Sequence, residues 1–292
     1  MVPLKFAVIG GDARAGWLAA LLAGDGHTVR SFALEKAALP QRVVPCSSLD
    51  ACVYGADWVL LGLPAEKDGK VLSPLSVQRI RTEELLTALW PGQTLCGGRL
   101  EQETALEAVR AGLSVCDLMT RRDFTVGNAA LTAEGAVGVL IRESPRSLWK
   151  GRALVTGWGR IASQLAPRLR ALGCETLVAA RKAGDRAAAE GFGLRACPFG
   201  EIAEHAGELD FLINTVPAPV IPKEALERLR PDCVLLELAS EAGFDRERAA
   251  ELGLRAVYAA GLPGRSAPCA AASLMRDTVY AVIREREERH GQ

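Results

Sequence analysis

The sequence predicts an α/β fold in which two doubly wound, parallel-sheet domains lie around a cleft. Short apolar runs of strand length alternate with amphipathic helical stretches along the whole chain, and this alternation is typical of parallel sheets with helices on both faces. Of the 292 residues, 49% are hydrophobic, which is enough for substantial cores. A chain of this length usually forms about two domains.

Strands and helices are expected to alternate in both halves of the chain. The strands are expected over residues 5–10, 28–33, 58–63, 94–97 and 114–118, and then over 152–156, 176–180, 211–215, 234–238 and 256–259. Helices are expected over residues 15–23, 82–89 and 101–111, and others begin near Ile161, Lys223 and Asp245. The apolar periodicity of each segment supports these assignments.

Two further helices are expected outside this alternation. Residues 128–142 carry an apolar face that suits a helix crossing from one domain to the other, with Asn128 as its N-cap. Residues 270–288 form a charged helical tail that is expected to pack back on the first domain. We therefore place the first domain at residues 1–126, completed by 269–292, and the second at residues 127–268.

Composition argues against several classes of function. Lys+Arg and Asp+Glu both total 35, so no net charge favours nucleic acid or an anionic membrane as a partner. The eight cysteines form no C-x-x-C pair and have no histidine at metal-ligand spacing, so we expect reduced thiols and no metal. Neither a signal peptide nor an apolar run of about 18 residues is visible. We expect a cytoplasmic protein, and leave open whether it is a homo-oligomer.

The segment that begins at Gly157 carries a nucleotide-binding pattern, G-x-G-x-x-A, between an apolar strand and an amphipathic helix. In Rossmann-like domains the first glycine permits a tight turn, the second lets the backbone approach the pyrophosphate, and a small third residue allows close helix–sheet contact. The helix N-terminus offers N–H groups to the anion. The expected cofactor-binding residues are Gly157, Trp158, Gly159, Arg160 and Ile161. A glycine turn without a ligand is the alternative.

The next strand indicates which dinucleotide binds. It ends in Arg181 and Lys182, where NAD enzymes usually carry a carboxylate for the ribose hydroxyls. A guanidinium can instead bind a 2′-phosphate through two charge-assisted hydrogen bonds, and Lys182 or Arg186 can add charge. NADP(H) is therefore favoured over NAD(H), with a solvated pair of surface cations as the alternative.

The end of a second strand, the one expected over residues 211–215, is expected beside the cofactor. The residues at this strand end lie at the carboxyl edge of the sheet, where ligands of open α/β folds bind. They are Asn214, Thr215, Val216 and Pro217. We expect them to border the adenosine or nicotinamide ribose, and an ordinary turn is the alternative.

The residues that carry the chemistry are harder to identify, because His27, His205 and His290 are each interpreted as incidental. Arginines at the end of the fifth strand can bind a carboxylate substrate, although a solvated linker fits equally well. The loop after the first strand lacks the three-glycine spacing of a nucleotide site, but its polar residues can face the cleft. The catalytic candidates are Arg122, Asp123 and Glu134, and the substrate-binding candidates are Asp12, Arg14, Asn128 and Thr132.

Several segments together resemble the A chain of dipicolinate synthase from spore-forming bacteria. They run in order along nearly the whole sequence, and the opening and closing segments are more specific than the glycine turn. The segments are residues 8–14 (VIGGDAR), 122–123, 128, 132–135 (TAEG), 157–160, 180–181, 214–217 (NTVP), 238–240, 260–264 (AGLPG) and 267–268. Cys269 departs from the family, in which a lysine often stands at this position, so a cationic role there is in doubt.

The resemblance implies a function that composition and spacing do not. It implies an NADP-linked dehydrogenase subunit that forms dipicolinate from a dihydrodipicolinate-type intermediate of the lysine and diaminopimelate pathway. It also implies a flavoprotein partner, which is the B chain of dipicolinate synthase, and a place in the mother cell of a sporulating bacterium. Two alternatives remain open. One is a non-catalytic, nucleotide-binding scaffold for the flavoprotein, and the other is an NADP reductase that acts on another carbonyl or imine.

Overall fold

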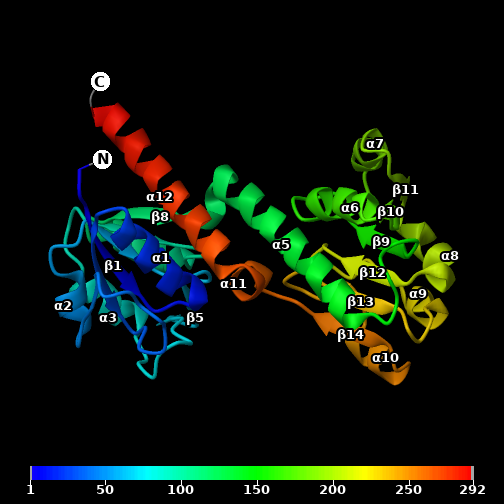
Figure 1. The fold of residues 1–292 in the computed structure, drawn as a ribbon, viewed down its shortest axis with the longest axis horizontal. Helices are drawn as coiled ribbons and strands as arrows, with labels where there is room; N and C mark the ends of the chain where they lie inside the picture. The colour runs from blue at the N-terminus through cyan, green and yellow to red at the C-terminus, as the bar shows by residue number, and fades with distance from the viewer. Residues whose placement is uncertain (1, 291–292) are drawn as a thin grey trace. The chain divides into compact units, whose positions relative to one another are not determined.

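The computed structural model describes residues 2–290 and contains two six-stranded parallel sheets (Figure 1). Their strand orders are β3-β2-β1-β4-β7-β8 and β11-β10-β9-β12-β13-β14. When the six strands of each sheet are renumbered in chain order, both strand orders read 3-2-1-4-5-6. This is the strand order of the doubly wound dinucleotide-binding fold. The predicted fold class is confirmed. By their internal contacts, the residues up to Asn128 and from Pro263 onward form one compact unit, and Ala129–Leu262 form another.

The first unit builds its sheet from strands and helices that alternate along the chain. Its elements are β1 (Lys5–Ile9), α1 (Ala13–Gly24), β2 (Thr28–Phe32), β3 (Val43–Pro45), α2 (Leu49–Val53), β4 (Trp58–Leu60), β5 (Glu66–Lys67), β6 (Lys70–Val71), α3 (Thr82–Ala88), β7 (Thr94–Gly97), α4 (Gln102–Arg110), β8 (Ser114–Asp117) and the 3-10 turn η1 (Leu118–Thr120). Strand β1 alternates in period two, because Phe6 and Val8 face one core while Ala7 and Ile9 face the other. Both faces of this sheet are therefore buried.

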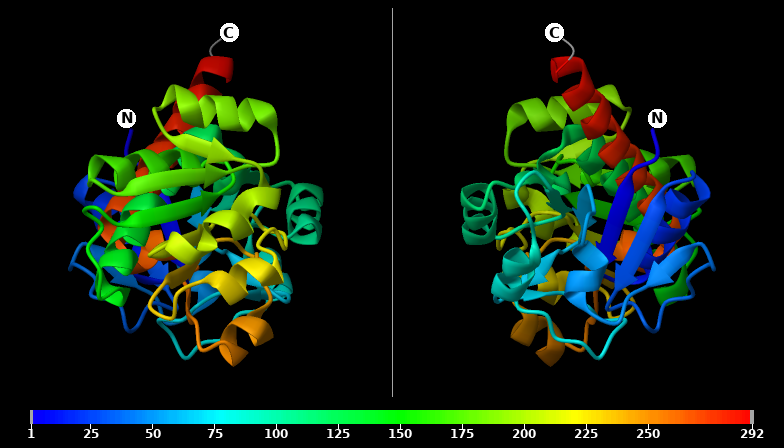
Figure 2. Two further views of the ribbon diagram at one scale, coloured as in Figure 1. Left: turned by 90° about the vertical axis from the view of Figure 1, so that its right-hand side faces the viewer. Right: turned by 90° about the vertical axis from the view of Figure 1, so that its left-hand side faces the viewer.

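The second unit repeats this arrangement. It contains β9 (Arg152–Thr156), α6 (Ala162–Ala171), β10 (Glu175–Ala179), α7 (Ala183–Gly191), β11 (Arg195–Cys197), η2 (Phe199–Glu201), α8 (Ile202–His205), η3 (Ala206–Glu208), β12 (Phe211–Asn214), α9 (Lys223–Arg228), β13 (Val234–Glu237), α10 (Arg246–Glu251) and β14 (Arg255–Tyr258). On β9, Val155 packs with α6 in one core and Leu154 packs with α8, α9 and α10 in the other. Figure 2 shows helices on both sides of the sheet.

Helix α5 (Arg122–Glu143) belongs to both units and corrects one prediction. It begins six residues before Asn128, so Asn128 lies inside the helix and is not its N-cap. The first turns are stabilised by tertiary contacts, since Phe124 is fully buried in the core of the first unit. By length and composition alone α5 could cross a membrane, but half of its most apolar window is buried inside the protein. Burial in the two cores accounts for this apolar character.

The tail folds as α11 (Leu262–Ser266) and α12 (Pro268–His290). Helix α12 packs against α1, as predicted (Figure 1). Met275 and Val279 of α12 share a core with Leu18 of α1. The contact with α5 is also close, because a Cβ added at Gly127 would lie 2.7 Å from the Leu274 side chain. The sheet of the first unit is thus covered by a helix that lies more than a hundred residues beyond it in the sequence.

Candidate functional site

The loop after β9 adopts the tight turn that its first glycine permits. Gly157 has a φ of +83°, and its N–H donates a 2.7 Å hydrogen bond to the carbonyl of Ala179 on β10. A Cβ at Gly157 would lie 2.8 Å from the side chain of Val216. Any larger residue would therefore strain the backbone and also push the loop away from the neighbouring strand end.

The second part of this loop leaves backbone donors and space for an anion. Gly159 is exposed, and a Cβ built on it would meet no atom within 4 Å. Helix α6 begins at Ala162, and its N-cap residue Ile161 supplies no side-chain cap. Within residues 2–290, no hydrogen bond from the amides of residues 158–162 is found. Free N–H groups at the positive end of a helix dipole form an anion-binding site.

The other residues of the loop surround this position without occupying it. Trp158 is half-buried and lies 5.7 Å, centroid to centroid, from the ring of Phe192. Arg160 is exposed and Ile161 is half-buried. The loop is therefore anchored by Trp158, while the Arg160 guanidinium remains accessible to a ligand.

A chain of buried polar side chains lies beneath the loop, at the carboxyl ends of three adjacent strands. Thr156 ends β9, Asn214 ends β12 and Glu237 ends β13, and each is at most 2% exposed. The Thr156 hydroxyl donates to Asn214 Oδ1 at 2.5 Å, and Asn214 Nδ2 donates to Glu237 Oε1 at 2.7 Å. Since buried polar groups are costly unless they are paired, this network fixes the strand ends relative to one another.

The network also positions the loops on either side. Asn214 Nδ2 donates to the carbonyl of Val216, and the carboxylate of Glu237 accepts from the amides of Ala239 and Gly243. Burial raises the pKa of Glu237, although these hydrogen bonds oppose the shift. The Asn214 side chain is therefore committed to the protein, and it supports the segment around Thr215, Val216 and Pro217 from below. Sequence reasoning missed Glu237, whose signal is a carboxylate at the end of an apolar strand.

The strand that follows the loop ends in cations with different roles. Arg181 and Lys182 are exposed, and no hydrogen bond or ion pair of either side chain is found among the described residues. Arg186 instead donates from Nη1 to the carbonyls of Ala180 and Arg181, each at 2.9 Å. Arg186 thus closes the turn that presents Arg181, whose side chain stays exposed.

In the first unit, the opening and closing segments of the sequence meet. Asp12 caps α1 by accepting from the amide of Arg14, and the two side chains form a bidentate ion pair at 2.9 and 2.7 Å. Arg14 is 4% exposed and also donates to the carbonyl of Leu63. A Cβ at Gly264 would lie 2.7 Å from Asp12 Oδ2 and 2.8 Å from Arg14 Nε. The pair needs a glycine at this position for its close approach.

The glycines after β1 serve packing in this unit. Gly11 donates to the carbonyl of Leu72 at 2.6 Å, and a Cβ at Gly10 would lie 2.8 Å from the same oxygen. The segment that follows the β5–β6 hairpin thus occupies the position next to this loop. Unlike the loop after β9, this one is filled by the chain itself.

Asp123 lies in an ion-pair network at the start of α5. Arg121 binds Asp123 through two nitrogens at 3.1 and 2.7 Å, and binds Glu285 of α12 through two contacts of 2.7 Å. The Arg121 guanidinium lowers the pKa of Asp123, which is opposite to what a base working near neutral pH needs. The network joins α5 to α12, and it leaves Arg122 exposed.

This assignment predicts how Asp123→Asn affects stability. The folded-state pKa of Asp123 is below its unfolded value, so its charge stabilises the protein above about pH 4 and this stabilisation is lost as the pH falls through the folded-state pKa. Because the pair is largely exposed, we expect Asp123→Asn to lower the free energy of unfolding by about 0.2–1 kcal/mol at pH 7. Urea unfolding at pH 7 and at about pH 2 measures this, because the stabilisation is still largely present at pH 4, and an equal difference at pH 7 and pH 2 would contradict it.

The remaining candidates lie along α5. Glu134 is exposed, whereas Thr132 is 8% exposed. Asn128 is half-buried, and both Asn128 and Thr132 interact with other groups of the chain. Their placement on α5 agrees with the predicted helix, but their roles toward a substrate stay predictions.

The comparisons with known proteins confirm the resemblance to the A chain of dipicolinate synthase. Residues 5–119 match the family model that describes the N-terminal domain of this A chain. Over 186 residues the protein is 28% identical to the dipicolinate synthase A chain of Bacillus subtilis (strain 168), and the match covers 63% of each chain. The matched region thus spans less than two thirds of that relative.

Solved structures are similar over almost the full length. The A chain of dipicolinate synthase from Bacillus subtilis has a TM-score of 0.84 at 25% identity, covering 99% of this chain and 98% of that one. Its counterpart from Bacillus halodurans has a TM-score of 0.86 at 23% identity, covering 97% and 98%. D-lactate dehydrogenase from Escherichia coli shares the fold alone, with a TM-score of 0.61 at 13% identity and 98% coverage of both chains. The fold is therefore dehydrogenase-like.

Proposed function

We propose, from the premise that this protein resembles the A chain of dipicolinate synthase, that it is an NADP-linked dehydrogenase subunit. As the resemblance implies, it forms dipicolinate (pyridine-2,6-dicarboxylate) from a dihydrodipicolinate-type intermediate of the lysine and diaminopimelate pathway. The proposed setting is the cytoplasm of a sporulating mother cell, with the flavoprotein B chain of the synthase as partner. The observation that carries the proposal is the loop after β9, where amides without a hydrogen-bond partner among the described residues and an open glycine face suit an anion.

A nicotinamide dinucleotide fits the residues around this loop. The amides of residues 159–161 and the start of α6 suit its pyrophosphate, because Gly159 leaves the space that any side chain would fill. Thr215 and Val216 lie beside Gly157 and are held by the buried network below, so they suit contact with a ribose. When bound, the nicotinamide supplies hydride acceptance or donation. The chain's own part is to bind and orient the reactants.

The choice of NADP over NAD depends on Arg181. The end of β10 carries no carboxylate for the ribose hydroxyls, and the exposed Arg181 offers a guanidinium whose geometry matches a phosphate. Lys182, also exposed, adds a second positive charge nearby. Arg186 is engaged by backbone carbonyls, so its part is to hold the turn.

For a dicarboxylate substrate, cationic or N–H donors are needed. Arg122 is exposed at the start of α5, and no ion pair of its side chain is found within residues 2–290. Arg14 is instead paired with Asp12. We therefore propose Arg122 as the arginine that meets a substrate carboxylate, while Asp12 and Arg14 hold the loop after β1 in place.

The test is a reaction with purified components. The protein, NADP and the freshly formed product of dihydrodipicolinate synthase are mixed with and without the flavoprotein partner, and reduced nicotinamide and dipicolinate are both measured. We expect both products to appear in a 1:1 ratio and to depend on this chain. Reduced cofactor with a different organic product would instead indicate a reductase of another carbonyl or imine.

A non-catalytic scaffold is the second candidate, and one observation favours it. Asp123 is held by Arg121 with a lowered pKa, and Glu134 lies exposed on α5, so neither is an evident proton acceptor. If the flavoprotein performs all the redox chemistry, dipicolinate will form without reduction of NADP even though NADP binds to this chain. That outcome would establish the scaffold and exclude the dehydrogenase.

A further inference from the structure

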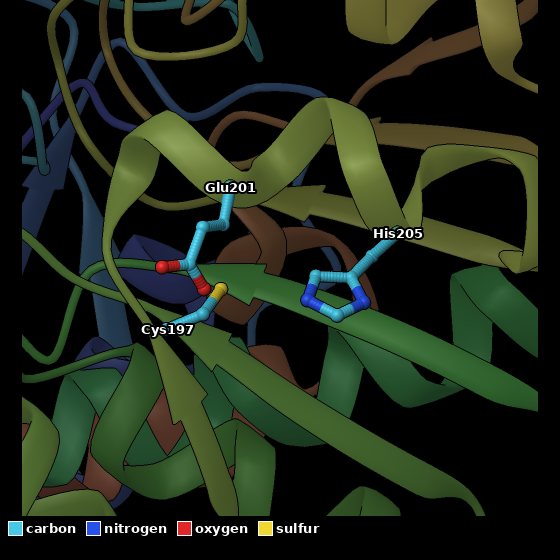
Figure 3. Close-up of side chains that lie close together, drawn as sticks. All are labelled: Cys197, Glu201 and His205. Carbon is cyan, nitrogen blue, oxygen red and sulfur yellow. The ribbon is translucent and has the colours of Figure 1, made fainter.

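Three side chains of metal-ligand type converge at the edge of the second sheet. Cys197 ends β11, Glu201 ends η2 and His205 ends α8. The Cys197 sulfur, a Glu201 carboxylate oxygen and a His205 ring nitrogen all lie within 4.8 Å of one another (Figure 3). Glu201 and His205 are four residues apart along continuous helical turns, which places them on the same face. The strand end brings Cys197 beneath them.

Among the residues that the structure describes, none bonds to any of these three side chains. Cys197 is 4% exposed, and Glu201 and His205 are half-buried. In the described part of the chain, no hydrogen bond or ion pair of their side-chain atoms is found. The nearby Glu208, in contrast, binds Arg152 at 2.8 Å. A thiol, a carboxylate and an imidazole thus lie close together, and within residues 2–290 none of the three is held by a hydrogen bond or an ion pair.

We propose that Cys197, Glu201 and His205 form a zinc site. Zinc takes sulfur, nitrogen and carboxylate oxygen ligands in tetrahedral geometry, whereas calcium and magnesium prefer oxygen alone. Bonds of about 2.0–2.3 Å place tetrahedral ligands roughly 3.5 Å apart, so ligand atoms that lie within 4.8 Å of one another need to draw together by at most about 1.3 Å. Glu201 and His205 can rotate without breaking another bond. The fourth position goes to water, and the Cys197 thiol releases its proton to solvent when its sulfur binds zinc.

The site would tie the edge strand to the helical segment that follows it. β11 has only three residues, and it pairs with β10 alone. The carbonyl of Cys197 accepts a 2.9 Å hydrogen bond from Ala180, the residue before Arg181. Zinc bound here would therefore stabilise the end of β11 next to the strand end that carries Arg181. This inference does not depend on the proposed dehydrogenase function.

Cobalt(II) serves as the spectroscopic probe for this site. The full-length chain, freed of metal by a chelator, is titrated with Co²⁺ under reducing conditions. We expect one Co²⁺ per chain, with the near-ultraviolet band of cobalt–thiolate bonding and visible bands typical of tetrahedral coordination, all displaced by Zn²⁺. Cys197→Ser is expected to abolish the thiolate band, and His205→Ala to weaken binding by more than about tenfold.

Cys269→Ser is the matched control, because Cys269 is the exposed thiol of the first unit. It should retain the band, and Zn²⁺ should raise the melting temperature of the control by more than that of His205→Ala. A thiolate band that persists in Cys197→Ser, or is lost in Cys269→Ser, would overturn the proposal, as would the absence of stoichiometric Co²⁺ binding. If circular dichroism shows that Cys197→Ser does not fold, His205→Ala and Glu201→Gln at their half-buried positions decide the test.

Discussion

Gly159→Val is expected to weaken NADP binding by more than about a hundredfold and to leave the stability of the protein almost unchanged. The new side chain would meet no protein atom near its Cβ, so we expect the free energy of unfolding to change by only about 0.5 kcal/mol. It would, however, fill the space proposed for the pyrophosphate. Loss of two charge-assisted hydrogen bonds, each worth about 1.5–3 kcal/mol, corresponds to that loss of affinity.

Two other glycines provide the controls. Gly157→Val should destabilise the protein as well as weaken binding, because Gly157 has a φ of +83° and a Cβ there would lie 2.8 Å from Val216. Gly138→Val, at an exposed position of α5 with open space around it, should affect neither property strongly. Calorimetry and urea unfolding measure the two effects separately. Wild-type NADP affinity in Gly159→Val would mean that the nucleotide does not rest on this loop.

Arg181→Ala is expected to weaken NADP binding about tenfold to a hundredfold and to leave NAD binding nearly unchanged. A hydrogen bond to a charged group contributes about 1.5–3 kcal/mol, and only NADP carries the phosphate that Arg181 would bind. The variant should fold normally, since the Arg181 side chain is exposed and nothing in the described chain is bonded to it.

Arg195→Ala is the matched control for this prediction. Arg195 is an exposed arginine of the same domain, but it begins β11 and pairs with Glu175 at the opposite end of the strand. Calorimetric titrations with NADP and NAD should give wild-type values for this variant. Equal weakening of both nucleotides in Arg181→Ala would indicate a role in pyrophosphate binding or folding, and an unchanged NADP affinity would remove Arg181 from the site.

The sequence predicted most of the fold because the buried strands carry long apolar signals. It missed β3 and β11, the third strand of each sheet, because three residues are too few for a periodic pattern to show. It also placed the start of α5 too late. Residues 122–127 include Gly127 and two β-branched residues, which favour helix weakly. Burial of Phe124 and the close contact between Gly127 and Leu274 override that local preference.

The candidate site was predictable only where a local pattern exists. The turn at Gly157 and Gly159 is a contiguous motif, and its backbone geometry follows from the two glycines. The network of Thr156, Asn214 and Glu237 joins three strands through the sheet register, so it depends on a strand order that a single sequence does not display. The same holds for the pair of Asp12 and Arg14 with Gly264, whose contact spans both ends of the chain.

The three side chains proposed to bind zinc were not singled out from the sequence for a related reason. Cys197, Glu201 and His205 follow one another at intervals of four residues. This spacing matches none of the familiar zinc motifs. A strand end, a 3-10 turn and a short helix together bring them to one point. Only the local fold reveals this arrangement.

We propose that the loop after β9 and Arg181 together bind a nicotinamide dinucleotide phosphate. Titration calorimetry of the wild-type chain with NADP and with NAD tests it most directly. We expect saturable binding of one NADP per chain, with NAD bound at least about tenfold more weakly because it lacks the phosphate contact. No heat of binding for either nucleotide at millimolar concentration, or a tighter complex with NAD, would contradict it.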